Sequence, residues 1–95
     1  MKHCVGVMTV DMTIPAGRSL KDRRSVVNSV KERVKHRCNV SVYEEPSETW
    51  QSAALAFACV AETESLVESQ FKQVAGIIEQ EPRLMVYGSR IQYYV

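Results

Sequence analysis

The chain contains 95 residues, 45% of them apolar and 24% charged, a composition typical of a globular domain and unlike that of a disordered protein. Its net charge is +1, and its three scattered cysteines have no C-x-x-C spacing, which argues against a disulfide framework and a zinc site. No apolar run approaches the roughly 18 residues of a membrane span and no cleavable signal opens the chain. We therefore expect one cytoplasmic domain over residues 1–95.

The first predicted element is a strand over residues 4–14. Its apolar residues alternate with polar ones, which places one set on a single buried face: Met8, Val10, Met12 and Ile14. Pro15 ends the strand because it lacks a backbone N–H, and residues 16–18 supply a loop.

A basic amphipathic helix is predicted over residues 19–38. Ser19 is a favourable N-cap, and Asp22 places an acid near the positive end of the helix dipole. The helix should end near Asn39. Its apolar arc comprises Leu20, Val27, Val30, Val34 and Cys38. We expect the valines of this arc to pack against the first strand, on Met8, Val10 and Met12.

The same helical segment concentrates positive charge. Between Arg18 and Arg37 lie eight of the twelve Lys and Arg residues against two acids, so the segment carries +6 and the remainder of the chain −5. Such an asymmetry produces a local field even though the total charge nearly cancels.

Two strands follow the helix. A short strand is predicted over residues 40–44, with Val40 and Val42 facing inward, and residues 45–49 form a turn. The apolar run over residues 53–61 is typical of a central strand that is covered on at least part of both faces.

The C-terminal third predicts a helix and a last strand. Thr63 or Ser65 caps the helix, which must stop before Pro82. The strand runs over residues 84–95, and Gly88 suggests a bulge. The order β-α-β-β-α-β predicts an α+β, ferredoxin-like fold, in which two helices cover one face of a four-stranded antiparallel sheet with the first and third strands central.

Several short motifs occur together along the chain: V-G-V at 5–7, I-P-A-G-R-S-L-K-D-R-R at 14–24, N-V-S-V at 39–42, W-Q at 50–51 and E-P-R at 81–83. Together they resemble the YlxP-like family, a family of small bacterial proteins of unknown function. The I-P-x-x-x-S-L-K-x-x-R block is the most specific part of this resemblance, which covers nearly the whole chain. The resemblance implies a ferredoxin-like fold, no assigned activity and frequent encoding beside translation and ribosome-maturation genes.

The cations of the first helix form the leading candidate site. On a helical wheel most of them fall along one flank of the apolar arc, where they can follow the phosphates of a polyanion. The candidate RNA-binding residues are Arg18, Lys21, Arg24, Lys31 and Lys35. We predict structured RNA, such as ribosomal RNA, as the partner; the alternative is an ordinary solvated helix face.

Aromatic residues form a second candidate surface, comprising Tyr43, Trp50, Tyr93 and Tyr94. Tyrosine and tryptophan give interfaces a large contact area with a polar group. They favour a protein-interaction module or a homodimer that uses the open sheet face. The alternative for Trp50 is that it closes one end of the core.

Other chemistries receive weaker signals. The sheet lacks the aromatic platform of RRM-type RNA readers, because the third strand offers Phe57 alone. Gly17, Arg18 and Ser19 can hold an anion at a helix N-terminus, as acylphosphatases of this fold require, but the Gly-rich arginine loop of those enzymes is not recognisable. Cys38 falls on the apolar arc, which favours an inert thiol. We expect no catalysis, metal or cofactor.

Overall fold

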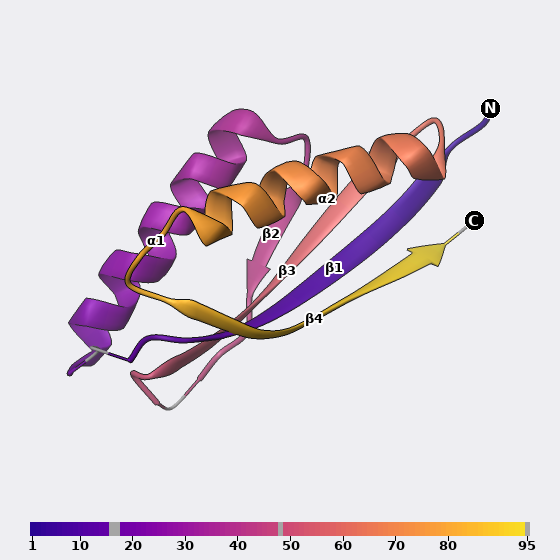
Figure 1. The fold of residues 1–95 in the computed structure, drawn as a ribbon. Coiled ribbons are helices and arrows are strands. Elements are labelled where there is room, and N and C mark those ends of the chain that lie inside the picture. The colour runs from indigo at the N-terminus through magenta and orange to yellow at the C-terminus, as the bar shows by residue number, and fades with distance from the viewer. Residues whose placement is uncertain (16–17, 48, 95) are drawn as a thin grey trace.

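A computed structural model describes residues 1–15, 18–47 and 49–94. The elements are β1 (Cys4–Thr13), α1 (Leu20–Arg37), β2 (Ser41–Glu44), β3 (Ser52–Ala61), α2 (Glu64–Glu79) and β4 (Met85–Tyr94). The strands form one antiparallel sheet in the order β2-β3-β1-β4, and both helices lie on the same face of it (Figure 1). This is the predicted ferredoxin-like βαββαβ fold. The predictions that involve Ala16, Gly17, Glu48 and Val95, including the anion site at Gly17, lie outside the described residues.

The first helix begins as its cap predicts. The Ser19 hydroxyl accepts a hydrogen bond from the Asp22 N–H at 3.1 Å, and the Asp22 carboxylate accepts one from the Arg18 N–H at 3.0 Å. The helix ends at Arg37, slightly before the predicted end near Asn39. Cys38 is the extended C-cap residue, and its N–H donates to the Val34 carbonyl at 2.9 Å.

The buried arc of α1 differs from the predicted one. Val27, Val30 and Val34 are fully buried as predicted, but Leu20 is 45% exposed, while Val26 and Arg23 are buried. Arg23 is buried because its side chain bonds to Glu44 of β2 and to the Ser52 carbonyl at the start of β3. The expected packing of α1 on β1 is also wrong, since α1 lies over β2 and β3 and it is α2 that covers β1.

The approach of α2 to β1 depends on a glycine. Gly6 faces the helices, and a Cβ atom there would lie 2.6 Å from Val67 Cγ1 and 3.0 Å from Phe71 Cε2. Both distances are shorter than ordinary van der Waals contact, so any side chain at this position would push α2 away from the sheet.

The two faces of the sheet differ in burial. Residues of β1 and β3 alternate, so that the helix face holds the core and the other face is open. On the open face of β3, Ala54 and Ala56 are half-buried while Ala58 and Val60 are exposed, so that face is covered over only part of the strand, within the expectation of at least partial cover on both faces. In β4, Asp11 pairs with Gly88 while Met12 pairs with Val86, which makes Tyr87 the extra residue of a bulge beside the predicted position.

Replacing Val30 with Asp should unfold the domain, because Val30 is fully buried and the new carboxylate would have no partner. We expect a loss of roughly 4 kcal/mol or more, a large part of the ~5–15 kcal/mol that stabilises a typical domain. Urea unfolding followed by circular dichroism measures it. Asn28→Asp, on the exposed side of the same helix, is the control and should unfold at nearly the wild-type midpoint. A Val30→Asp variant as stable as this control would contradict the burial of Val30.

Candidate nucleic-acid interface on the first helix

The structure keeps most of the predicted cations on the solvent side of α1. Arg18, Lys21, Arg24 and Lys35 are exposed. Within residues 1–15, 18–47 and 49–94, none of these four forms an ion pair with a carboxylate. From Lys21 to Lys35 the helix rises by about 21 Å at 1.5 Å per residue. The exposed cations therefore extend along most of the helix.

Lys31 belongs to a different group. Its ammonium lies 3.2 Å from Glu44 Oε1, and its side chain is only 24% exposed. The other oxygen of the same carboxylate lies 3.0 Å from Arg23 Nη1, and Arg23 Nε donates to the Ser52 carbonyl at 2.9 Å. Lys31 and Arg23 thus attach α1 to β2 and to the start of β3. This corrects the prediction that Lys31 is an available phosphate contact.

Arg23 has a structural role that was not predicted from the sequence. It is 6% exposed, and its Nη2 atom is buried without a hydrogen-bond partner among the residues described. Its helical spacing indicates the buried position, because Arg23 lies three and four residues before Val26 and Val27 and so shares the buried side of the helix.

A second ion cluster attaches α1 to the turn between α2 and β4. The Glu81 carboxylate is 5% exposed and accepts hydrogen bonds from Arg83 Nε at 2.8 Å, Arg83 Nη2 at 2.9 Å and Arg33 Nη2 at 3.1 Å. Hydrogen bonding from the Arg83 side chain is the main cause that lowers the pKa of Glu81, and burial opposes it. Arg33 is therefore also engaged within the fold.

The predicted aromatic surface is divided. Tyr43 and Tyr94 lie on the open face, 61% and 51% exposed, but on its two outer strands β2 and β4. Tyr93 pairs with Gly6 on the helix face, where it is half-buried, and burial raises the pKa of its hydroxyl. Trp50 lies in the connection between β2 and β3 and is 45% exposed.

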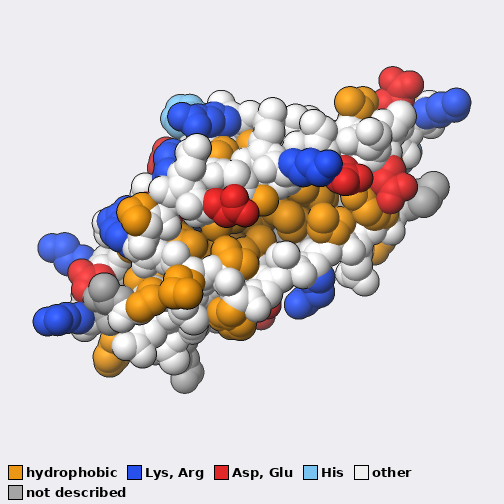
Figure 2. Space-filling model, viewed as in Figure 1, with side chains coloured by type: hydrophobic (Ala, Val, Ile, Leu, Met, Phe, Trp, Pro, Cys, Tyr) orange, Lys and Arg blue, Asp and Glu red, His pale blue; other side chains and the backbone are white. Residues whose placement is uncertain are grey.

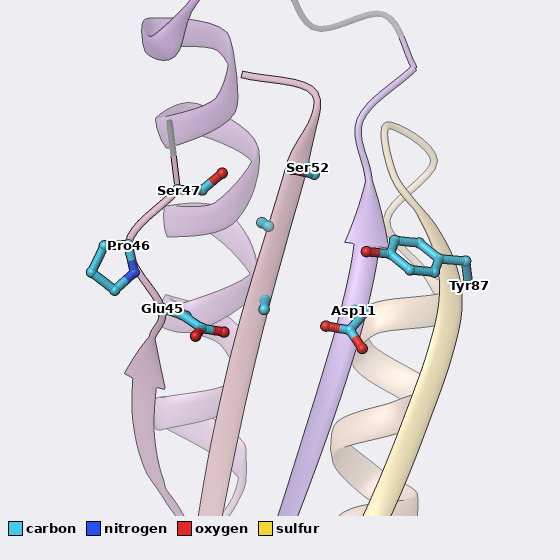
Figure 3. A pocket seen from close by; sticks show the side chains of 8 residues that line it. Asp11, Glu45, Pro46, Ser47, Ser52 and Tyr87 are labelled. Atoms are coloured by element: carbon cyan, nitrogen blue, oxygen red, sulfur yellow. The ribbon is translucent and has the colours of Figure 1, made fainter. Parts of the chain in front are cut away.

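A shallow pocket of about 220 Å³ lies at one end of the open face. It is lined by Asp11, Glu45, Pro46, Ser47, Ser52, Ala53, Ala54 and Tyr87. The Asp11 and Glu45 carboxylates point toward β3 from opposite sides, and the Tyr87 ring extends over β1 (Figure 3). Two carboxylates make this end of the face unsuitable for phosphate. Phe57 is fully buried on the helix face, so it provides no platform for stacking a base.

The remaining candidate residues give little chemistry. Cys4, Cys38 and Cys59 are buried free thiols, and burial raises the pKa of Cys38 and of Cys59. In the described part of the chain, no group of three or more His, Cys, Asp or Glu side chains is placed to hold a metal ion. Neither helix, so far as its residues are described, is long and apolar enough to cross a bilayer.

The sheet order, the two helices on one face and the exposed cations of α1 define a small ferredoxin-like α+β domain with a basic outer helix. The chain belongs to the family described as "Protein of unknown function (DUF503)", whose model matches residues 5–91. It is 25% identical to the uncharacterized protein YlxP of Bacillus subtilis (strain 168) over 91 residues, which make up 95% of this chain and 99% of that protein.

Solved structures agree on the fold. A de novo designed protein with ferredoxin fold superposes with a TM-score of 0.57 at 16% identity, over 97% of this chain and 86% of the designed one. A putative chlorite dismutase superposes with a TM-score of 0.58 at 16% identity, over 100% of this chain and 44% of that longer one. At such low identity the likeness establishes the fold alone.

Replacing Glu81 with Gln should destabilise the protein in a pH-dependent way. The pKa of Glu81 is depressed in the folded state, so its stabilising effect is complete above the unfolded value of about 4.3 and is lost as pH falls through the folded value. We expect the variant to lose about 2 kcal/mol at neutral pH, the scale of hydrogen bonds to a charged group. Urea unfolding over a pH series should show this deficit shrinking below about pH 4.

The control for this prediction is Glu68→Gln, because Glu68 forms only a solvent-exposed pair with Lys72 at 3.5 Å. This variant should stay close to wild type at every pH. If Glu81→Gln lowers the free energy of unfolding by the same amount at acid and neutral pH, the charge of Glu81 is not what stabilises the turn.

Proposed function

We propose that this protein is a non-catalytic accessory protein that binds structured RNA, such as ribosomal RNA, through the outer side of α1. The observation that carries the proposal is that Arg18, Lys21, Arg24 and Lys35 remain exposed, whereas Arg23, Lys31 and Arg33 are taken up by Glu44 and Glu81. In this proposal the protein acts in the cytoplasm, a setting supported by its three free thiols.

Phosphate contact explains why the partner should be a nucleic acid. Lysine and arginine that approach a dense line of phosphates release condensed counterions, and this release supplies sequence-independent affinity. A rigid helix carrying such cations fits a backbone whose shape is fixed, and duplex RNA is recognised mainly by its shape and its phosphates. The binding should therefore depend strongly on salt and weakly on sequence.

The test is the double variant Lys21→Gln/Lys35→Gln, which spares the ion pairs of Lys31. Both side chains are exposed, so the thermal midpoint should change little. Each lost phosphate contact lowers the slope of log K against log salt by about one unit, so the double variant should lose about two units for unrelated structured RNAs. Fluorescence anisotropy over a salt series measures the slope.

The matched control is Lys2→Gln/Lys72→Gln, which removes the same charge from exposed positions away from α1. It should retain most of the wild-type slope. Equal losses in the two double variants would mean that only the total charge matters. Undiminished RNA affinity in the Lys21/Lys35 variant would rule out α1 as the binding surface.

A second candidate function is that of a protein-interaction module that acts without nucleic acid. It is favoured by the open sheet face, where Tyr43, Val60 and Tyr94 are 61%, 54% and 51% exposed. Burial of apolar surface is insensitive to moderate salt, whereas phosphate contacts weaken steeply with it. Co-sedimentation with ribosomal subunits that survives raised salt would favour this candidate over the first.

A further inference from the structure

The edge strand β4 is left open by the fold. It is the last strand in the order β2-β3-β1-β4, and it contains ten residues with no proline and a single charge, Arg90. The opposite edge is different, because β2 has four residues and is followed by Glu45 and Pro46. Of the features that protect sheet edges from further pairing, β4 has one charge and the bulge at Tyr87, but it is neither short nor interrupted by proline.

Apolar side chains on β4 are exposed on both faces of the sheet. Val86 and Ile91 pair with Met12 and Met8, which places them on the helix face, yet they are 44% and 41% exposed. Met85 and Tyr94, on the open face, are 64% and 51% exposed, and Tyr87 at the bulge is 66% exposed. This density of exposed apolar residues on one strand exceeds the scattered exposure that is normal for a soluble protein.

A groove between α2 and β4 continues this apolar surface. It has a volume of about 130 Å³ and is lined by Met8, Val10, Ala75, Ile78, Glu79, Val86 and Ser89. Figure 2 shows hydrophobic side chains gathered in the band between the two elements. Met8 and Val10 belong to the core, at 4% and 3% exposure, so the core itself reaches the surface along this groove.

We propose that β4 pairs in antiparallel orientation with β4 of a second copy of this chain, across a two-fold axis. The two sheets then join into one of eight strands. Helix-face side chains of the partner's strand, equivalent to Val86 and Ile91, cover the groove beside α2. An antiparallel pair of identical strands is isologous, which means that the same patch of each copy forms the interface. The exposed apolar residues of β4 on one copy therefore contact the exposed apolar residues of β4 on the other.

Length, charge and area favour a second copy as the occupant. The two β4 strands have equal length by symmetry. The single charge on β4 already has a partner in its own chain, because Arg90 Nη1 lies 3.9 Å from Asp11 Oδ2. Ten residues span about 34 Å along the edge. A contact that extends through the depth of the domain, whose two smaller extents are 22 and 18 Å, would bury roughly 700 Å² per copy, near the ~800 Å² of a standard stable interface.

This dimer does not rest on the proposed RNA binding. α1 lies over β2 and β3, at the far side of the sheet from β4. The exposed cations of α1 remain accessible in both copies of the dimer. A variant that loses RNA binding can therefore still be tested for dimerisation, and a variant that loses dimerisation can still be tested for RNA binding.

Sedimentation equilibrium at tens of micromolar tests the proposal. Wild type should have the mass of a dimer, and Ile91→Lys should weaken dimerisation at least about a hundredfold, because it buries a charge at the new interface. Tyr43→Lys is the matched control, since Tyr43 is exposed on the open face at the opposite edge. It should remain dimeric, and the thermal midpoint of dilute samples should show that both variants fold.

Backbone amide exchange provides the second measurement. About half of the amides of residues 85–94 point to the free edge of a lone sheet and should exchange quickly there. In the proposed dimer they are protected, and their protection rises with protein concentration. A monomeric wild type, fast exchange at this edge at high concentration, or a dimer broken by Tyr43→Lys and kept by Ile91→Lys would overturn the proposal.

Discussion

The Glu44 carboxylate holds the first helix in place. One of its oxygens lies 3.0 Å from Arg23 and the other 3.2 Å from Lys31, and Glu44 itself is the last residue of the edge strand β2. The Arg23 side chain is 7% exposed and that of Glu44 24%, so loss of Glu44 would leave the buried Arg23 guanidinium without its charge partner. The pair is therefore a strong positional constraint on α1.

The layout of the surface follows from this constraint. With α1 fixed over β2 and β3, α2 lies above β1 and contacts β4 only in part, so apolar side chains of β4 stay exposed. The exposed cations of α1 and the apolar edge of β4 consequently lie on opposite sides of one small sheet. A domain this size cannot cover all the apolar surface of its secondary structure, and where that surface remains open depends on how its helices are attached.

Most of the fold was predictable because it is encoded locally. The alternation of β1 and the hydroxyl caps Ser19 and Thr63 depend on residues within a few positions of each other. The exposure of Leu20 was not predictable from the helical wheel, because the wheel places Leu20 at the same angle as the buried Cys38. Tyr93 and Tyr94, predicted on one surface, are neighbours in a strand and so lie on opposite faces, and the bulge at Tyr87 sets which of the two faces each one takes.

The candidate site was predictable only in part for a related reason. A helical wheel locates cations on a helix, but it does not show which of them find acids elsewhere in the chain. Lys31 pairs with an acid 13 residues away and Arg33 with one 48 residues away, separations that only the folded chain brings together. The wheel therefore overestimated the cations that are free to bind a partner.

The three buried thiols give the protein an internal reporter of its own opening. Cys4, Cys38 and Cys59 are 9%, 8% and 2% exposed, and they come from β1, the end of α1 and β3. Because both thiols are buried and burial raises the pKa of Cys38 and Cys59, a thiol reagent should reach them mainly through local opening of the structure around each one. The rate of labelling of each cysteine therefore measures how often its part of the core opens, without any engineered probe.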